Sequence, residues 1–139
     1  MWRTLSVALL AAGVAAAQDR QSADVIVQAV KVQTTKKNGD PWDVLGGAPD
    51  LKVTVRNKAR GGATHSTKVK ADTFEASFGE RTVRVSVGDE IEVTVHDEDE
   101  RLHDKVGEKT VKVTADTLKK KELKLDFDRV ISLTLEFEP

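Results

Sequence analysis

The chain has 139 residues, of which 22 are Lys or Arg and 23 are Asp or Glu, and 39% of its residues are hydrophobic. This near balance of charge argues against nucleic-acid binding, which usually needs a basic excess. The hydrophobic content is that of a folded domain and not of a disordered chain. Because the sequence has no cysteine, disulfides and thiol chemistry are excluded.

The N-terminus has the pattern of a secretory signal peptide. Arg3 precedes an apolar run from Leu5 to Ala16, and small residues then lead into a polar segment. We therefore expect a signal peptide over residues 1–17 that is cleaved after Ala17, because about 12 apolar residues are too few to span a bilayer. The mature protein would be secreted or periplasmic, with a flexible lead-in at residues 18–23 and one domain over residues 24–139.

The first half of the domain is predicted to be strands joined by turns. The segment DVIVQAVKVQ is rich in β-branched residues, and the next strands alternate apolar and polar side chains. A long loop with several Gly and Pro residues separates the first two strands. The strand before Gly88-Asp89 and the strand after it are predicted to form a hairpin. The expected strands are 24–33, 50–57, 64–70, 82–87 and 90–96.

The second half continues in the same way. Alternation predicts strands over 108–114, 123–127 and 131–137, and the segment ADTLKKK at 115–121 predicts one helical turn. The fold class is therefore all-β. About eight short strands with no long amphipathic helix predict an eight-stranded antiparallel β-sandwich.

Two acidic loops give the strongest functional signal. Asp97, Asp99 and Asp104 follow directly after the strand that carries Val93 and Val95. The long first loop adds Asp43 and Asp50. Both loops are odd-to-even connections of an antiparallel sandwich, so both can lie at the same end. Because Ca²⁺ takes six to eight oxygen ligands, largely from carboxylates and carbonyls, we predict a calcium site between them.

These loops resemble the calcium loops of C2 domains. The segment DVLGGAPDLKV at 43–53 is similar to the family's first calcium loop, and VTVHDEDERLHDKVGE at 93–108 is similar to its third. The likeness extends over about residues 24–139. It implies a C2-like β-sandwich of the topology whose first strand leads into the first calcium loop, called type II. It also implies one or two Ca²⁺ ions, with the following ligands: Asp43, Asp50, Asp97, Asp99 and Asp104.

The first loop differs from the family pattern at Pro49-Asp50-Leu51, where the family usually has Asp-Pro-Tyr. It is also one residue longer between its two aspartates, and the third loop is one residue shorter between Asp99 and Asp104. These differences bear on the geometry of a metal site more than on the fold.

Several alternatives remain open at this stage. The acidic loops could be solvated turns, since aspartate is common in turns, and Asp40 lies in such a turn. His96 and His103 could bind a transition metal with the aspartates. The domain could also be a metal-free β-sandwich interaction or adhesion module of the cell envelope. We expect no enzymatic activity, because the sequence has no nucleophile motif and no phosphate-binding loop.

The expected partners are calcium and, beyond it, an anionic membrane surface or an extracellular protein. Membrane-binding C2 domains usually carry apolar or basic residues at their loop tips. Trp42, or Val44 and Leu45, could serve in the first loop, with Arg101, Leu102 and Lys105 in the third. Alternatively, Trp42, Val44 and Leu45 pack against the core.

Overall fold

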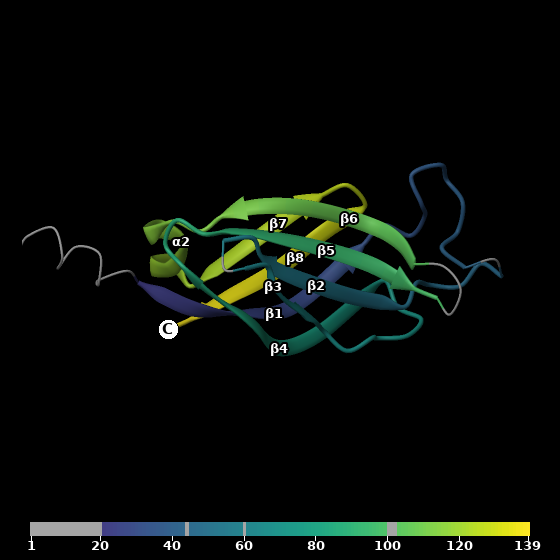
Figure 1. The fold of residues 1–139 in the computed structure, drawn as a ribbon. Helices are drawn as coiled ribbons and strands as arrows, with labels where there is room; N and C mark the ends of the chain where they lie inside the picture. Colours follow the sequence, from purple (N-terminus) through teal and green to yellow (C-terminus); the bar gives the residue numbers. More distant parts are fainter. Residues whose placement is uncertain (1–20, 44, 60, 100–102) are drawn as a thin grey trace, which may run out of the picture.

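The computed structural model describes residues 21–43, 45–59, 61–99 and 103–139 of the chain. The predicted signal peptide lies outside this range. Eight strands form two four-stranded sheets, one in the order β4-β1-β8-β7 and the other in the order β3-β2-β5-β6. The strand pairs in both sheets are antiparallel. The all-β sandwich expected from the sequence is confirmed (Figure 1).

The bounds of most elements are close to those predicted, but the strand expected over 82–87 begins at Glu75 and the strand expected over 108–114 begins at His103. The one helix among the described residues is a single short segment near the C-terminus, where the sequence predicted a helical turn. The elements are β1 (Ser22–Val32), β2 (Leu51–Asn57), β3 (Ala63–Ser66), β4 (Glu75–Ser86), β5 (Glu90–Glu98), β6 (His103–Lys112), α2 (Ala115–Lys120), β7 (Glu122–Phe127) and β8 (Val130–Glu138).

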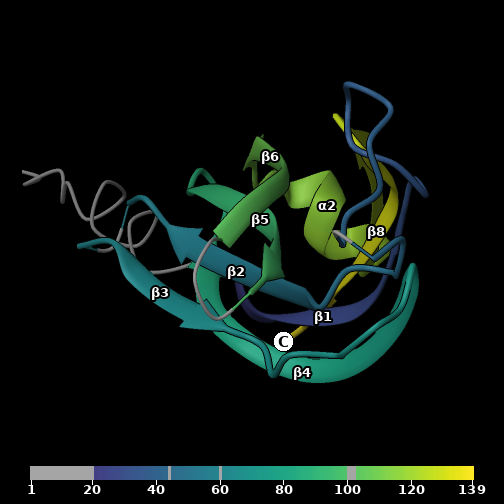
Figure 2. The same ribbon diagram turned by 90° about the vertical axis from the view of Figure 1, so that its right-hand side faces the viewer.

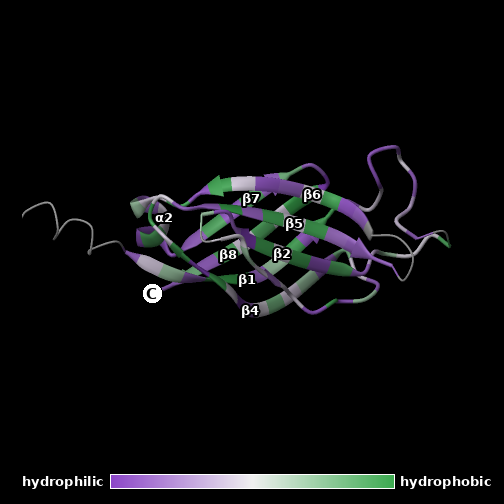
Figure 3. Ribbon diagram, viewed as in Figure 1, coloured by the Kyte–Doolittle hydropathy of each residue, from purple (hydrophilic) through white to green (hydrophobic). Residues whose placement is uncertain are grey.

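The core lies between the two sheets and follows from the alternation of apolar residues. Leu51, Val53 and Val55 of β2 are fully buried, while Lys52 and Thr54 between them are partly exposed. Successive side chains of a strand point to opposite faces, so this pattern gives each sheet an apolar inner face. Figure 3 shows the same alternation as green and purple bands along the strands.

Several sequence predictions about the strands were wrong. The expected hairpin does not form, because β4 pairs with β1 while β5 pairs with β2 and β6 in the other sheet. The expected strand over 64–70 ends at Ser66, so Lys68 and Lys70 lie beyond it. In addition, β1 begins at Ser22, inside the range expected as lead-in.

The turn between β4 and β5 moves the chain from one sheet to the other. The buried carboxylate of Asp89 accepts hydrogen bonds from the backbone of Ser86 and from Asn57 Nδ2 of β2. The amide of Asn57 also donates to the carbonyl of Arg84 (3.0 Å). These bonds satisfy the polar groups of a corner in which the two strands separate.

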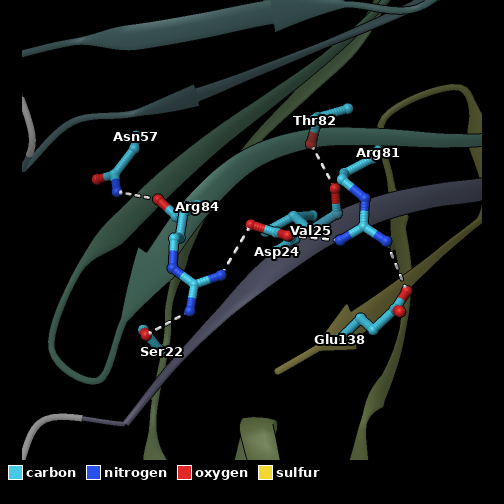
Figure 4. A network of polar contacts seen from close by, with 8 residues as sticks. All are labelled: Ser22, Asp24, Val25, Asn57, Arg81, Thr82, Arg84 and Glu138. Carbon is cyan, nitrogen blue, oxygen red and sulfur yellow. Dashed lines mark hydrogen bonds and ion pairs between the residues drawn. The ribbon is translucent and has the colours of Figure 1, made fainter.

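The outer face of the β4-β1-β8 sheet carries a polar network that links β1 to β4 and β4 to β8 (Figure 4). Asp24 of β1 accepts hydrogen bonds from Arg81 and Arg84 of β4. Arg81 also reaches Glu138 of β8 (3.1 Å). The hydrogen bond from Arg81 is the main reason that the pKa of Asp24 is lowered from its usual value.

The connections at the two ends of the sandwich differ in character. Helix α2 and the C-terminus lie at one end, and the β1–β2 connection, the end of β5 and the start of β6 lie at the other (Figures 1 and 2). Among the described residues, no helix has both the length and the apolar character needed to cross a membrane. The end that carries the two acidic connections is the one considered below.

Candidate metal centre

The acidic residues of the β5–β6 region are placed by the same alternation that builds the core. Ile91, Val93 and Val95 of β5 point inward, and Asp97 continues that series at the end of the strand. Only 7% of Asp97 is exposed. Asp104 of β6 is its direct cross-strand partner, so the two side chains share one face of the sheet. Asp97 and Asp104, which the sequence placed in a loop, thus belong to strands.

Asp50 joins the first acidic loop to Asp97. Its backbone N–H donates to Asp97 Oδ1 (2.8 Å), and its carbonyl accepts from the backbone N–H of Glu98 (2.8 Å). Its carboxylate accepts a hydrogen bond from the backbone N–H of Asp72 (2.7 Å). Asp50 therefore anchors three connections of the chain at one point.

Asp72 was not predicted as part of this region. It lies between β3 and β4, and it adopts a left-handed conformation with φ of 51°. Its carboxylate accepts a hydrogen bond from the backbone N–H of Ala48 in the first loop (3.1 Å). The β3–β4 connection is also odd-to-even, so the same topological argument that joined the two acidic loops could have placed Asp72 here.

All five predicted aspartates line one hollow of about 220 Å³. Asp43 is fixed there by a local turn, in which its Oδ1 accepts from the backbone N–H of Leu45 (3.3 Å). Gly47 passes close by, since a Cβ atom at this position would lie 3.1 Å from Asp43 Oδ2. The residues that line the hollow are Lys36, Trp42, Asp43, Ala48, Asp50, Asp97, Asp99 and Asp104.

The electrostatics of the hollow are dominated by negative charge. Burial raises the pKa of the Asp97 carboxyl, and the neighbouring charges of Asp50, Asp104 and Asp99 raise it further, against the lowering effect of the Asp50 backbone hydrogen bond. Among the described residues, Lys36 is the one cationic side chain that lines the hollow, with its Nζ atom 2.9 Å from Asp104 Oδ2. Sequence analysis did not predict a role for Lys36.

The donor set fits a hard divalent cation, because it consists of carboxylate oxygens. The positions of the donors are less compact than a finished metal site would require. Across the part of the chain that the structure describes, no three acidic or histidine side chains lie close enough together to hold one ion. Four of the five carboxylates already have protein partners. Asp43 accepts from the backbone N–H of Leu45, and Asp50 accepts from that of Asp72. Asp97 accepts from the backbone N–H of Asp50, and Asp104 pairs with Lys36.

Trp42 packs against the core and is not a loop tip. Only 6% of this residue is exposed, and its Nε1 atom donates to the carbonyl of Gln33 (2.8 Å). Of the two alternatives left open by the sequence, the core position is therefore the one observed. Leu45, in contrast, is 94% exposed. Val44, Arg101 and Leu102 lie outside the described residues, so the proposals about their roles stay predictions.

Gly107 lets β6 approach the β7–β8 turn beside the site. A Cβ atom at Gly107 would lie 3.0 Å from Phe127 Cδ2 and 3.1 Å from Asp128 Cβ. We expect Gly107→Ala to lower the free energy of unfolding by about 1–3 kcal/mol, because the added methyl group overpacks this contact. Urea denaturation would measure the loss. Thr110→Ala, at an exposed position of the same strand, is the control, and equal losses in both variants would contradict the packing argument.

Comparisons with known proteins were made for sequence and for structure. No family model and no curated protein sequence matches the chain. Solved structures do match. A C2 domain of plant extended synaptotagmin 1 has a TM-score of 0.59 at 17% identity, over 85% of this chain and 94% of that one. A calcium-bound structure of two C2 domains of extended synaptotagmin 2 has a TM-score of 0.56 at 17% identity, over 84% and 45% of the two chains.

Human GIVD cytosolic phospholipase A2 also matches, with a TM-score of 0.66 at 19% identity, over 86% of this chain and 17% of the phospholipase chain. The likeness thus covers less than a fifth of that protein. Together with the sheet order and the loop positions, these matches show that the chain has the C2 fold. Its first strand leads directly into the first acidic loop, which is the arrangement expected from the sequence.

Proposed function

We propose that the chain is an exported C2-like domain that binds Ca²⁺ between its β1–β2 and β5–β6 connections. The supporting observation is that five aspartates line one hollow although they come from two separate parts of the chain. Asp43 and Asp50 lie in the β1–β2 connection, and Asp97, Asp99 and Asp104 lie where β5 ends and β6 begins. Export is supported by the signal-peptide pattern of residues 1–17 alone. A calcium-bound structure among the matches is consistent with the proposal, although at 17% identity it supports the fold and not the ligands.

Calcium would serve as a stabilising link between the connections. Outside the cell Ca²⁺ is plentiful, and extracellular modules bind it with Kd values of about 10⁻⁴ to 10⁻³ M. At this affinity millimolar Ca²⁺ would occupy much of the protein and would neutralise carboxylates that otherwise repel one another. A bound ion would also attract the anionic groups of a partner.

Calcium binding should be visible as thermal stabilisation. For a Kd of about 10⁻³ to 10⁻⁴ M, 10 mM Ca²⁺ contributes about 1.4–2.7 kcal/mol, which corresponds to a rise in Tm of about 5–10 °C. Differential scanning calorimetry of metal-stripped protein would measure it, and calorimetric titration would give the Kd. Asp99→Asn should reduce the rise, whereas Asp116→Asn on helix α2, at the opposite end, is the matched control. An unchanged Tm in 10 mM Ca²⁺ would rule out the site.

Calcium-dependent attachment to an anionic membrane is a second candidate. It is supported by Leu45, which is 94% exposed beside the carboxylate of Asp43. Sedimentation with phosphatidylserine vesicles, with and without EDTA, would test it. If the protein binds Ca²⁺ but does not sediment in either condition, the ion stabilises the domain without attaching it to lipid. A metal-free interaction module is the remaining alternative, and it predicts no response to Ca²⁺ in either assay.

A further inference from the structure

We propose that Lys36 is the built-in counter-cation of this carboxylate cluster, and that a divalent cation binds there in competition with its ammonium group. The role of Lys36 as counter-cation concerns the metal-free protein, whereas the competition with a divalent cation rests on the proposed function. The central observation is the ion pair between Lys36 Nζ and Asp104 Oδ2 (2.9 Å). It links the β1–β2 connection to the start of β6, across the hollow that both line.

The backbone that carries Lys36 is held in place. Lys36 N donates to Asp40 O (2.8 Å), and Gly39 N donates to Lys36 O (3.0 Å), which closes a tight turn. Gly39 has a φ of 90°, a conformation that favours glycine. The preceding carbonyl, that of Thr35, accepts hydrogen bonds from the guanidinium of Arg129 at 3.0 and 2.8 Å. The ammonium group therefore extends toward Asp104 from a fixed base.

The charges around the ammonium favour this position. The hydrogen bond with Asp104 raises the pKa of Lys36, and the negative charges of Asp104, Asp97 and Asp40 add to the effect. Asp104 is also the cross-strand partner of buried Asp97. Lys36 thus offsets repulsion between two carboxylates that share one face of the sheet, which is the task that a bound cation would otherwise perform.

The ion pair also occupies Asp104, one of the carboxylates that a divalent ion would use. Asp104 is directed toward Lys36, and a divalent ion that uses Asp104 must break that ion pair. Lys36 also lines a second hollow of about 440 Å³, beside Trp42 and the β7–β8 turn. The two hollows share Lys36, Trp42 and Asp104, so a displaced ammonium group has space beside its original position.

The test compares Lys36→Met with Lys37→Met in the full-length protein. Lys37 is the matched control because it is the adjacent residue and lines only the second hollow. Calorimetric titration should show Ca²⁺ binding about two- to fivefold tighter in Lys36→Met than in wild type, with little change in Lys37→Met. In EDTA, Lys36→Met should lower the Tm by a few degrees, and the further change Asp104→Asn should cancel most of that loss.

The outcomes separate this inference from the proposed function. Wild-type binding with no gain in Lys36→Met would overturn the inference and leave the calcium site intact. Binding to Lys36→Met alone would support the inference and remove the native calcium site. If neither protein binds Ca²⁺, the proposed function and the competition fail together. Even in that case, a Tm in EDTA that is the same in Lys36→Met and Lys37→Met would overturn the role of Lys36 as counter-cation.

Discussion

Replacing Trp42 by alanine is expected to lower the free energy of unfolding by about 3–5 kcal/mol. The side chain is almost fully buried in the core between the sheets, and its Nε1 atom donates to the carbonyl of Gln33. It also lines both hollows at this end of the sandwich. Its removal would leave a cavity beneath the β1–β2 connection, which positions Asp43 and Lys36. Urea denaturation, monitored by circular dichroism, would measure the loss of unfolding free energy.

Trp42→Phe separates the packing of the ring from its hydrogen bond. Phenylalanine keeps much of the apolar volume but cannot donate to Gln33, so we expect a smaller loss of about 1–2 kcal/mol. Calcium affinity should fall more in the alanine variant than in the phenylalanine variant, because only the former leaves the connection unsupported. If Trp42→Ala unfolds at the same urea concentration as wild type, this residue does not anchor the loop.

The fold could largely be predicted because alternation along a strand is a local signal. Leu51, Val53 and Val55 indicate a half-buried strand whatever its neighbours are, and the structure confirms it. The predicted pairing of β4 with β5 was wrong, because a local signal such as alternation does not say which sheet a strand joins. Gly88-Asp89 looked like a hairpin turn, but the buried Asp89 carboxylate bonds to Asn57 of β2 and stabilises a corner between the sheets.

The candidate site also has a part that the sequence predicts and a part that it does not. The positions of the aspartates could be predicted because topology puts odd-to-even connections at one end, and the structure brings all five to one hollow. Lys36 could not be predicted, because its contact with Asp104 depends on a turn held by Arg129 from a distant part of the chain. Side-chain pairs between loops follow from tertiary structure and leave no periodic pattern in the sequence.

Replacing Asp97 by asparagine is expected to have opposite effects with and without calcium. The pKa of Asp97 is raised, so the folded protein binds a proton there more readily than the unfolded chain does. Its favourable contribution is therefore present below the ordinary aspartate pKa, near 4, and is lost as the pH rises through the raised value. Above the raised pKa, the metal-free protein carries a buried charge at Asp97 among like charges. Asparagine removes that charge and keeps an Oδ1 acceptor for Asp50 N.

In EDTA at pH 7, Asp97→Asn should therefore raise the Tm by a few degrees, and the difference from wild type should shrink below about pH 4. With calcium the order should reverse, because the variant lacks one carboxylate ligand and should bind Ca²⁺ about tenfold or more weakly. Thermal melts from pH 3 to 8, in EDTA and in 10 mM Ca²⁺, would measure both effects. A Tm for Asp97→Asn below that of wild type in EDTA at pH 7 would show that the Asp97 charge stabilises the fold. The carboxylates would then form a structural network that needs no cation.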